Sequence, residues 1–170
     1  MQVREIMTGE VKSCRPETDV ATVATIMWEQ DCGCVPVVGD DGRVVGMITD
    51  RDICMAVATR PRIAGEITVG EAISGKVHAC SPDAEVTEAL RIMQREKLHR
   101  LPVVDREGKL AGILSLNDLV RNAKKGGGKR HVSHSEVMAT LKSLSEHRIS
   151  PAAPAAAAPV LPDIREQETI

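Results

Sequence analysis

The sequence predicts an α+β fold in which one β-α-β-β-α unit occurs twice. The first observation is an internal repeat, since residues 3–57 align without a gap with residues 69–123 at an offset of 66 positions. The second is an apolar stripe with helical spacing in each copy. The third is a pair of short apolar runs in each copy, joined by a turn that ends in glycine. Such a repeat implies two copies of one supersecondary unit that pack against each other.

Identical residues support the repeat along its whole length. They include the pairs Val11 and Val77, Cys14 and Cys80, Pro16 and Pro82, Val20 and Val86, Ile26 and Ile92, Met27 and Met93, Pro36 and Pro102, Val37 and Val103, and Gly42 and Gly108.

The first half of each unit predicts a short strand followed by a helix. In the first copy we expect a strand over residues 11–14, stopped by Pro16, and a helix whose N-cap is Asp19. The stripe that faces the core then consists of Val20, Val23, Ala24 and Met27, and in the second copy of Val86, Ala89, Leu90 and Met93.

The second half of each unit predicts a hairpin and another helix. Apolar runs at residues 35–38 and 44–48 flank Asp41-Gly42, and glycine accepts the positive φ that such a turn requires. The copy uses Glu107-Gly108. A helix follows from Thr49 or Asp50. We therefore expect a first unit over residues 1–59, a linker over 60–65 and a second unit over 66–123.

Residues 124–170 lie outside the repeat. Residues 124–130 predict a flexible basic connector, and a solvated linker is favoured there over a contact for nucleic acid. Ser135 can cap a helix that runs to about His147. Its apolar face would dock on the body of the protein or on a second copy, and consists of Val137, Met138, Leu141 and Leu144. Residues 150–162 are rich in Pro and Ala and predict an extended spacer.

Composition and charge narrow the possible functions. The 170 residues include no Phe or Tyr and only one Trp, so a nucleic-acid platform built on aromatic stacking is nearly excluded. The net charge of −2 gives no global field for DNA or an anionic membrane. No apolar run reaches the roughly 20 residues of a membrane span. The N-terminus lacks the layout of a signal peptide, and five cysteines do not suggest a disulfide framework, so we expect a cytoplasmic protein with reduced thiols.

At the end of the hairpin in each unit stands a hydroxyl residue, and aspartate follows it three positions later. The two signatures are Thr49-x-x-Asp52 and Ser115-x-x-Asp118. As local structure, each is a capping box that satisfies free backbone N–H groups at a helix start. As a site, a helix N-terminus can receive an anion, and a carboxylate can accept hydrogen bonds from ribose hydroxyls. Both roles can hold together.

The tandem units, the Pro-Val-Val runs at residues 36–38 and 102–104 and the Gly-x-x-Thr/Ser-x-x-Asp ends together resemble a pair of CBS (cystathionine-β-synthase) domains, also called a Bateman module. The resemblance covers residues 3–123. It implies two units with pseudo-twofold symmetry whose sheets pack together and leave two clefts. It also implies that the clefts bind adenine nucleotides or related adenosyl ligands, and that the protein is regulatory and forms homodimers, often flat discs of four units.

The resemblance also assigns roles to particular residues. Asp52 and Asp118 would hold ribose hydroxyls, while Thr49 and Ser115 would contact phosphate or ribose. Phosphate would further be met by His99 and Arg100 in the second unit, whereas the matching Gly33 and Cys34 in the first unit carry no charge and Arg51 can compensate for them. The walls of the adenine site would be Val35, Ile48, Leu101 and Leu114.

Two alternatives stay open. A thiol or metal protein would use Cys32 and Cys34, but tetrahedral zinc usually takes four ligands from two such pairs and the sequence offers no second pair. An adaptor would keep the fold without a ligand and bind a partner through its tail. Because we find no catalytic motif, we expect a non-enzyme with no metal and no cofactor beyond a regulatory adenine nucleotide, acting on an unknown effector protein.

Overall fold

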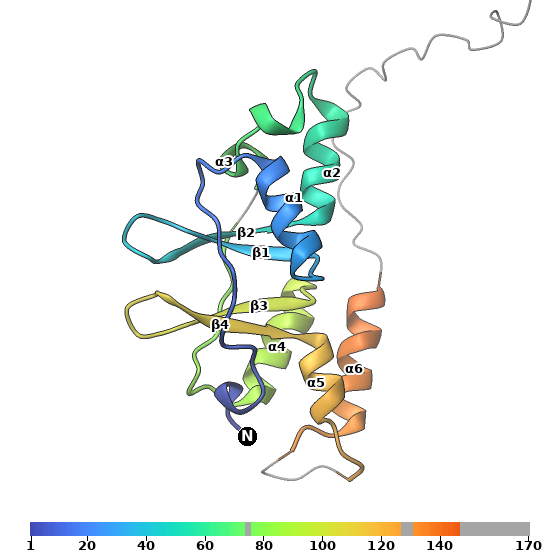
Figure 1. Cartoon of the computed structure of the whole chain (residues 1–170). Coiled ribbons are helices and arrows are strands. Elements are labelled where there is room, and N and C mark those ends of the chain that lie inside the picture. Colours follow the sequence, from blue (N-terminus) through green and yellow to red (C-terminus); the bar gives the residue numbers. More distant parts are fainter. Residues whose placement is uncertain (74–75, 127–130, 147–170) are drawn as a thin grey trace, which may run out of the picture.

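Two stacked α+β units form the molecule, each built around a two-stranded antiparallel sheet (Figure 1). The computed structural model describes residues 1–73, 76–126 and 131–146. The first unit contains α1 (Val20–Glu29), β1 (Cys34–Val38), β2 (Val44–Thr49), α2 (Asp50–Thr59), the 3₁₀ turn η2 (Ala64–Glu66) and α3 (Val69–Ala72). The second contains α4 (Val86–Glu96), β3 (Arg100–Val104), β4 (Leu110–Ser115), α5 (Leu116–Asn122) and α6 (His134–Ser145), with the N-terminal 3₁₀ turn η1 (Val3–Glu5) packed on it. The α+β prediction is confirmed.

The hairpins follow the prediction in both units. Gly42 and Gly108 adopt φ angles of 78° and 83°, the left-handed region that the turn requires. A register shift follows in the same place in each hairpin, between Val37 and Val38 and between Val103 and Val104. The two copies therefore share their irregularities as well as their strands.

The strand expected at residues 11–14 is wrong. Only Cys14 pairs there, in one parallel bridge to Val37, with hydrogen bonds from Cys14 N to Pro36 O (3.0 Å) and from Val38 N to Cys14 O (2.9 Å). The chain turns away at once, because Thr18 N bonds back to Arg15 O across Pro16. Cys80 makes the same single bridge in the second unit.

The first helix of each unit begins as expected but buries different faces. Asp19 caps α1 by accepting a hydrogen bond from Thr22 N at 2.9 Å. All four expected positions of α4 are buried, whereas Ala24 of α1 is exposed, contrary to prediction. No described segment packs over Ala24 in the way that α6 packs over α4.

Each unit is completed by a segment from the other repeat. Val3 lies in the core of the second unit, and its N–H donates to Ala84 O at 3.0 Å. Its counterpart Val69 lies with Ile67 in the core of the first unit, with Val69 N bonded to Thr18 O at 2.8 Å. The packed units thus exchange the N-terminal ends of the sequence repeats, and the exact domain boundaries stay a prediction.

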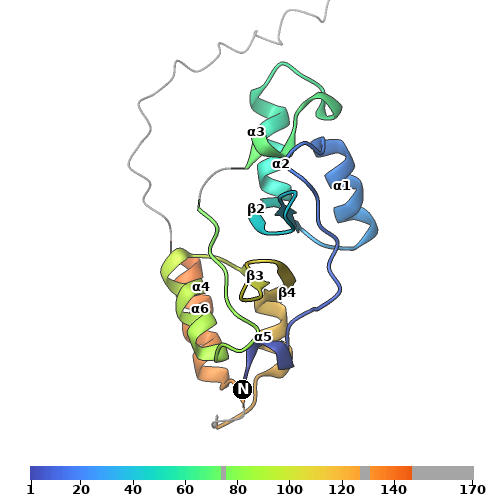
Figure 2. The same cartoon turned by 90° about the vertical axis from the view of Figure 1, so that its left-hand side faces the viewer.

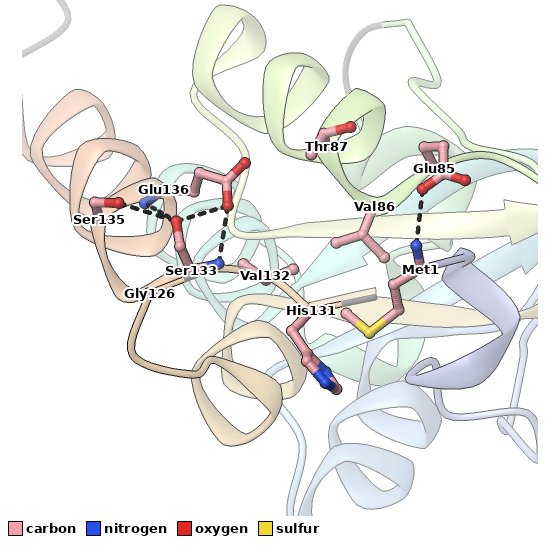
Figure 3. Close-up of a pocket in the computed structure, with 10 residues that line it drawn as sticks. All are labelled: Met1, Glu85, Val86, Thr87, Gly126, His131, Val132, Ser133, Ser135 and Glu136. Carbon is pink, nitrogen blue, oxygen red and sulfur yellow. Dashed lines mark hydrogen bonds and ion pairs between the residues drawn. The ribbon is translucent and has the colours of Figure 1, made fainter. Parts of the chain in front are cut away.

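The C-terminal helix α6 packs on α4 and α5 (Figures 1 and 2). Its N-cap is Ser133 and not Ser135, because Ser133 and Glu136 form a reciprocal capping box: Glu136 N donates to Ser133 Oγ (3.2 Å), and Ser133 N donates to Glu136 Oε2 (2.8 Å; Figure 3). Val137 is buried as expected, but Met138 is exposed.

Thr140 is buried in the place expected for an apolar side chain of α6. Its hydroxyl accepts a hydrogen bond from Gln94 Nε2 of α4 at 2.7 Å. The centre of the expected connector (127–130), the end of the expected helix at His147 and the Pro/Ala-rich spacer lie outside the described residues. In the described ranges, no helix is long and apolar enough to cross a membrane.

Candidate ligand-binding cleft

A cleft of about 810 Å³ lies between the two units. The first repeat contributes its signature residues Thr49 and Asp52, together with Arg51. The second repeat contributes His99 and Arg100 from the start of β3. The structure therefore brings together five of the eleven predicted site residues, and it does so across the two repeats.

The signature of the first repeat is a complete capping box. Asp52 Oδ2 accepts hydrogen bonds from Thr49 N (2.9 Å) and Thr49 Oγ1 (2.7 Å), while Asp52 N donates to Thr49 Oγ1 at 3.2 Å. The same bonds occur between Ser115 and Asp118, so the capping role is confirmed in both repeats. The bonds to the Asp52 carboxylate all go to Oδ2, which leaves Oδ1 available to a ligand hydroxyl.

Positive charge dominates the lining of the cleft. Four of its side chains are arginine or lysine, namely Arg51, Lys76, Lys97 and Arg100, and His78 and His99 add two imidazoles. The carboxylates in the lining are Asp52 and Glu146, and Glu146 is already paired with Lys97 at 2.7 Å. Such a surface attracts anions, and a cleft with low-dielectric walls strengthens its field.

Arg100 connects the second repeat to the first. Its backbone pairs with Ser115 in the β3–β4 hairpin, but its guanidinium extends to the first repeat. A Cβ on Gly33 would lie 3.4 Å from the Arg100 Nη2 and 3.0 Å from Asp50 Oδ2. Gly33 itself carries no charge at the position that matches His99. Because it has no side chain, it leaves room for the guanidinium of Arg100 from the other unit.

The four expected adenine-wall residues do not line the cleft. Val35, Ile48, Leu101 and Leu114 are at most 1% exposed and belong to the two hydrophobic cores. Side chains alternate between the two faces of a strand, so their neighbours face the other way. The residues that line the cleft from the strands are Cys34, Gly46, Met47, Thr49, Arg100 and Pro102.

Sequence reasoning missed Lys76, His78 and Lys97. Lys76 and His78 lie on the irregular segment before α4, and Lys97 is the C-cap of α4 in a left-handed conformation with φ of 55°. No local pattern marks these residues, because only the packing of the two units brings them into the same cleft as Asp52. The only sequence signal that could have pointed to Lys76, His78 and Lys97 was that they are basic residue types, which suit an anionic ligand.

The second signature lies outside this cleft. Ser115 and Asp118 are not in its lining, and the adjoining strand β4 is covered by the N-terminal segment. Thr8 N donates to Ile113 O and Ile113 N donates to Thr8 O, both at 2.9 Å. A Cβ on Gly112 would meet Thr8 O at 2.4 Å. The two signatures therefore have different surroundings despite their equal sequence pattern.

The cysteines provide little support for thiol or metal chemistry. Burial raises the pKa of Cys34 to about 11, so its thiol is protonated at neutral pH. Cys14 and Cys80 are buried with pKa values raised to about 11 for the same reason. The Cys32 thiol donates to Cys34 O at 3.4 Å. Across the residues with described positions, no three His, Cys, Asp or Glu side chains form a metal-binding group.

Comparison with known proteins agrees with the fold. The CBS domain model matches residues 3–59 and 69–125. The CBS domain-containing protein YhcV of Bacillus subtilis is 30% identical over 139 residues, which cover 79% of this chain and 97% of that protein.

Two solved structures extend the comparison. The hypoxic response protein I, a Mycobacterium tuberculosis protein solved with two coordinated zinc ions, has a TM-score of 0.66 at 30% identity and covers 71% of this chain and 98% of its own. The Arabidopsis thaliana CBS-pair protein CBSX2, solved in complex with AMP, has a TM-score of 0.59 at 26% identity and covers 71% of this chain and 93% of its own.

Proposed function

Because the chain belongs to the CBS domain family and carries the domain twice, we propose that it is a regulatory module whose cleft binds an anionic adenine nucleotide such as AMP, ADP or ATP. The observation that carries the proposal is the meeting of Asp52 with Arg100 in one cleft, since these side chains come from different repeats. A carboxylate can accept hydrogen bonds from ribose hydroxyls, and a guanidinium can donate to phosphate oxygens, so the two groups together suit a nucleotide.

The geometry supports a defined orientation of the ligand. Ribose hydroxyls would donate to Asp52 Oδ1, the oxygen that the capping box does not use. The positive end of the α2 dipole favours negative charge nearby, and Arg100 offers two parallel donors to phosphate oxygens. Met47 and Pro102 supply apolar surface for the base. A thioether is suited to contact with an aromatic ring.

The charge of the cleft favours nucleotides over S-adenosylmethionine. Four arginine and lysine side chains line it, namely Arg51, Lys76, Lys97 and Arg100, against the two carboxylates of Asp52 and Glu146. A nucleoside phosphate is an anion, whereas S-adenosylmethionine carries a sulfonium cation. The complex of the relative CBSX2 with AMP supports an adenine nucleotide in this fold.

A regulatory role would follow from the fact that three separate parts of the chain line the cleft. Its lining comes from both repeats and from the end of α6, so a bound nucleotide stabilises one arrangement of these three parts. A cytoplasmic location, energy sensing, pairing with a second copy, an effector protein and the lack of a catalytic role belong to the same proposal.

A thermal-shift panel of AMP, ADP, ATP, GTP, adenosine and S-adenosylmethionine tests the proposal. A ligand at 100 times its dissociation constant should stabilise the protein by about 2.7 kcal/mol. We expect a shift with an adenine nucleotide that exceeds the shifts with adenosine and S-adenosylmethionine. The absence of a shift with every ligand would refute the proposal and favour the adaptor alternative.

Two matched variants locate the site. Asp52→Asn and Asp118→Asn change the same position of the same capping box, so their structural costs are similar. Only Asp52 lines the cleft. We expect Asp52→Asn to abolish the shift and Asp118→Asn to retain it. Equal effects of the two variants would contradict the placement of the ligand.

A further inference from the structure

Backbone geometry around the two signatures is the same in both repeats. Every residue pair of the β1–β2 hairpin recurs in the β3–β4 hairpin at the offset of 66 positions. Asp31 and Lys97, which precede the two hairpins at this offset, adopt φ angles of 47° and 55°, in a left-handed region that residues other than glycine rarely occupy. The offset therefore relates equivalent positions in the folded units as well as in the sequence.

The two signatures also present the same chemical groups. Asp118 Oδ2 accepts a hydrogen bond from Ser115 N at 2.7 Å and another from Ser115 Oγ. The bonds of this capping box leave Oδ1 to a ligand hydroxyl, as those of Asp52 do. The signatures alone therefore give no reason for a nucleotide to prefer one repeat over the other.

A segment of the other repeat passes over the glycine of each signature. A Cβ on Gly46 would lie 2.6 Å from Ile73 Cδ1, and a Cβ on Gly112 would lie 3.3 Å from the Sδ of Met7, which is the equivalent residue. The first signature lines a cleft although Ile73 passes over its glycine. Cover of this kind therefore does not decide which signature takes a ligand.

The basic side chains of the cleft do not recur at the offset. Three of them are replaced by a carboxylate or an amide, in the pairs Lys76 and Glu10, Lys97 and Asp31, and Arg51 and Asn117. The three replacement residues are exposed. Arg100 corresponds to the uncharged Cys34, while His78 corresponds to Lys12, which keeps one basic group. The charge that dominates the cleft is thus reversed at the equivalent positions.

We propose that these charged side chains decide which of the two signatures takes a nucleotide. The inference rests on the proposed function of the cleft and identifies the residues that select phosphate. Lys76 and Arg51 attract phosphate to the first signature. Glu10 and Asp31 repel it from the second, because carboxylates and phosphate carry like charges. The chain then binds one nucleotide, although it carries the signature twice.

Isothermal titration calorimetry with ATP, and with AMP in parallel, counts the sites of the full chain. The wild-type protein should bind one nucleotide per chain. A triple variant with the basic residues of the cleft at their equivalent positions should bind two, and its substitutions are Glu10→Lys, Asp31→Lys and Asn117→Arg. Lysine fits the left-handed conformation of residue 31, since Lys97 adopts it. Asp118→Asn, added to the triple variant, should return it to one nucleotide per chain.

Two further variants separate a defined site from a general attraction between charges. Glu17→Lys combined with Glu66→Lys replaces exposed acidic residues that neither line the cleft nor correspond to its lining, and this variant should still bind one nucleotide. Lys76→Glu introduces the residue of the equivalent position and should weaken binding of the nucleotide by about 2-fold to 30-fold.

Several results would overturn the inference alone. They are two nucleotides bound by the wild-type protein, one bound by the triple variant, a second site that survives Asp118→Asn or that Glu17→Lys with Glu66→Lys also creates, and an unchanged affinity of Lys76→Glu. A wild-type protein that binds no nucleotide would instead refute the proposed function, and the inference with it.

Discussion

Two equivalent glycines should respond differently to the same substitution. Gly46 and Gly112 precede the two signatures at matching positions of β2 and β4. A Cβ on Gly112 would lie 2.4 Å from the backbone oxygen of Thr8, and a Cβ on Gly46 would lie 2.6 Å from Ile73 Cδ1. The Cβ on Gly112 would therefore clash with a hydrogen-bonded backbone atom, whereas the Cβ on Gly46 would clash with the end of a flexible side chain.

The structure sets the expected magnitudes. Gly112→Ala must displace Thr8 and break its two hydrogen bonds with Ile113, each worth about 0.5–1.5 kcal/mol, so the free energy of unfolding should fall by about 1–3 kcal/mol. Gly46→Ala displaces only the end of the Ile73 side chain, and holding that side chain about 30° off its rotamer costs about 0.5–1.5 kcal/mol. Gly112→Ala should therefore be the more destabilising variant.

Urea denaturation of the wild-type protein and both variants measures the difference. The slope m should stay constant while the midpoint falls further for Gly112→Ala. A Gly46→Ala variant as unstable as Gly112→Ala, or more so, would refute the reasoning. It would show that the N-terminal segment does not hold β4 through the Thr8 contact.

Three further predictions concern single side chains. The exposed Cys54 should react with a disulfide reagent at pH 8 much faster than the three buried cysteines, and similar rates for all would contradict their burial. Hydrogen bonds from Thr68 and Arg62 hold the pKa of Glu71 at about 2, below its ordinary value of 4.5, so its contribution to stability should be present above pH 4.5 and lost as the pH falls towards 2. Chemical denaturation across this range should show the loss for the wild-type protein but not for Glu71→Gln. Glu146→Gln removes a carboxylate from the cleft, so calorimetry should show nucleotide affinity about twofold to fivefold higher, whereas a lower affinity would contradict the position of this group.

Local sequence patterns predicted much of the fold. The two hairpins with glycine at their turns, the Asp19 cap and both capping boxes depend on residues close together in the chain. These features are set by backbone conformation and by hydrogen bonds over a few residues, and therefore the sequence alone was enough to place them.

The candidate site was harder to predict, because it depends on packing between segments far apart in the chain. The family resemblance implied that Val35 and Ile48 would wall the adenine site, but no local pattern showed that their face of the hairpin meets the core and the other face meets the cleft. Nor did any local pattern show that Arg100 reaches the first repeat, or that Val3 and Val69 exchange between the units.

Isothermal titration calorimetry of the full chain with ATP, ADP and AMP tests the central claim most directly. The proposal predicts saturable binding of at least one of them, with one high-affinity site per chain in the cleft that contains Asp52. Arg100→Gln should weaken that binding by about 10-fold to 100-fold, because a hydrogen bond to a charged group contributes about 1.5–3 kcal/mol. No binding of any of the three, or binding that Arg100→Gln leaves unchanged, would contradict the claim that this cleft is a nucleotide site.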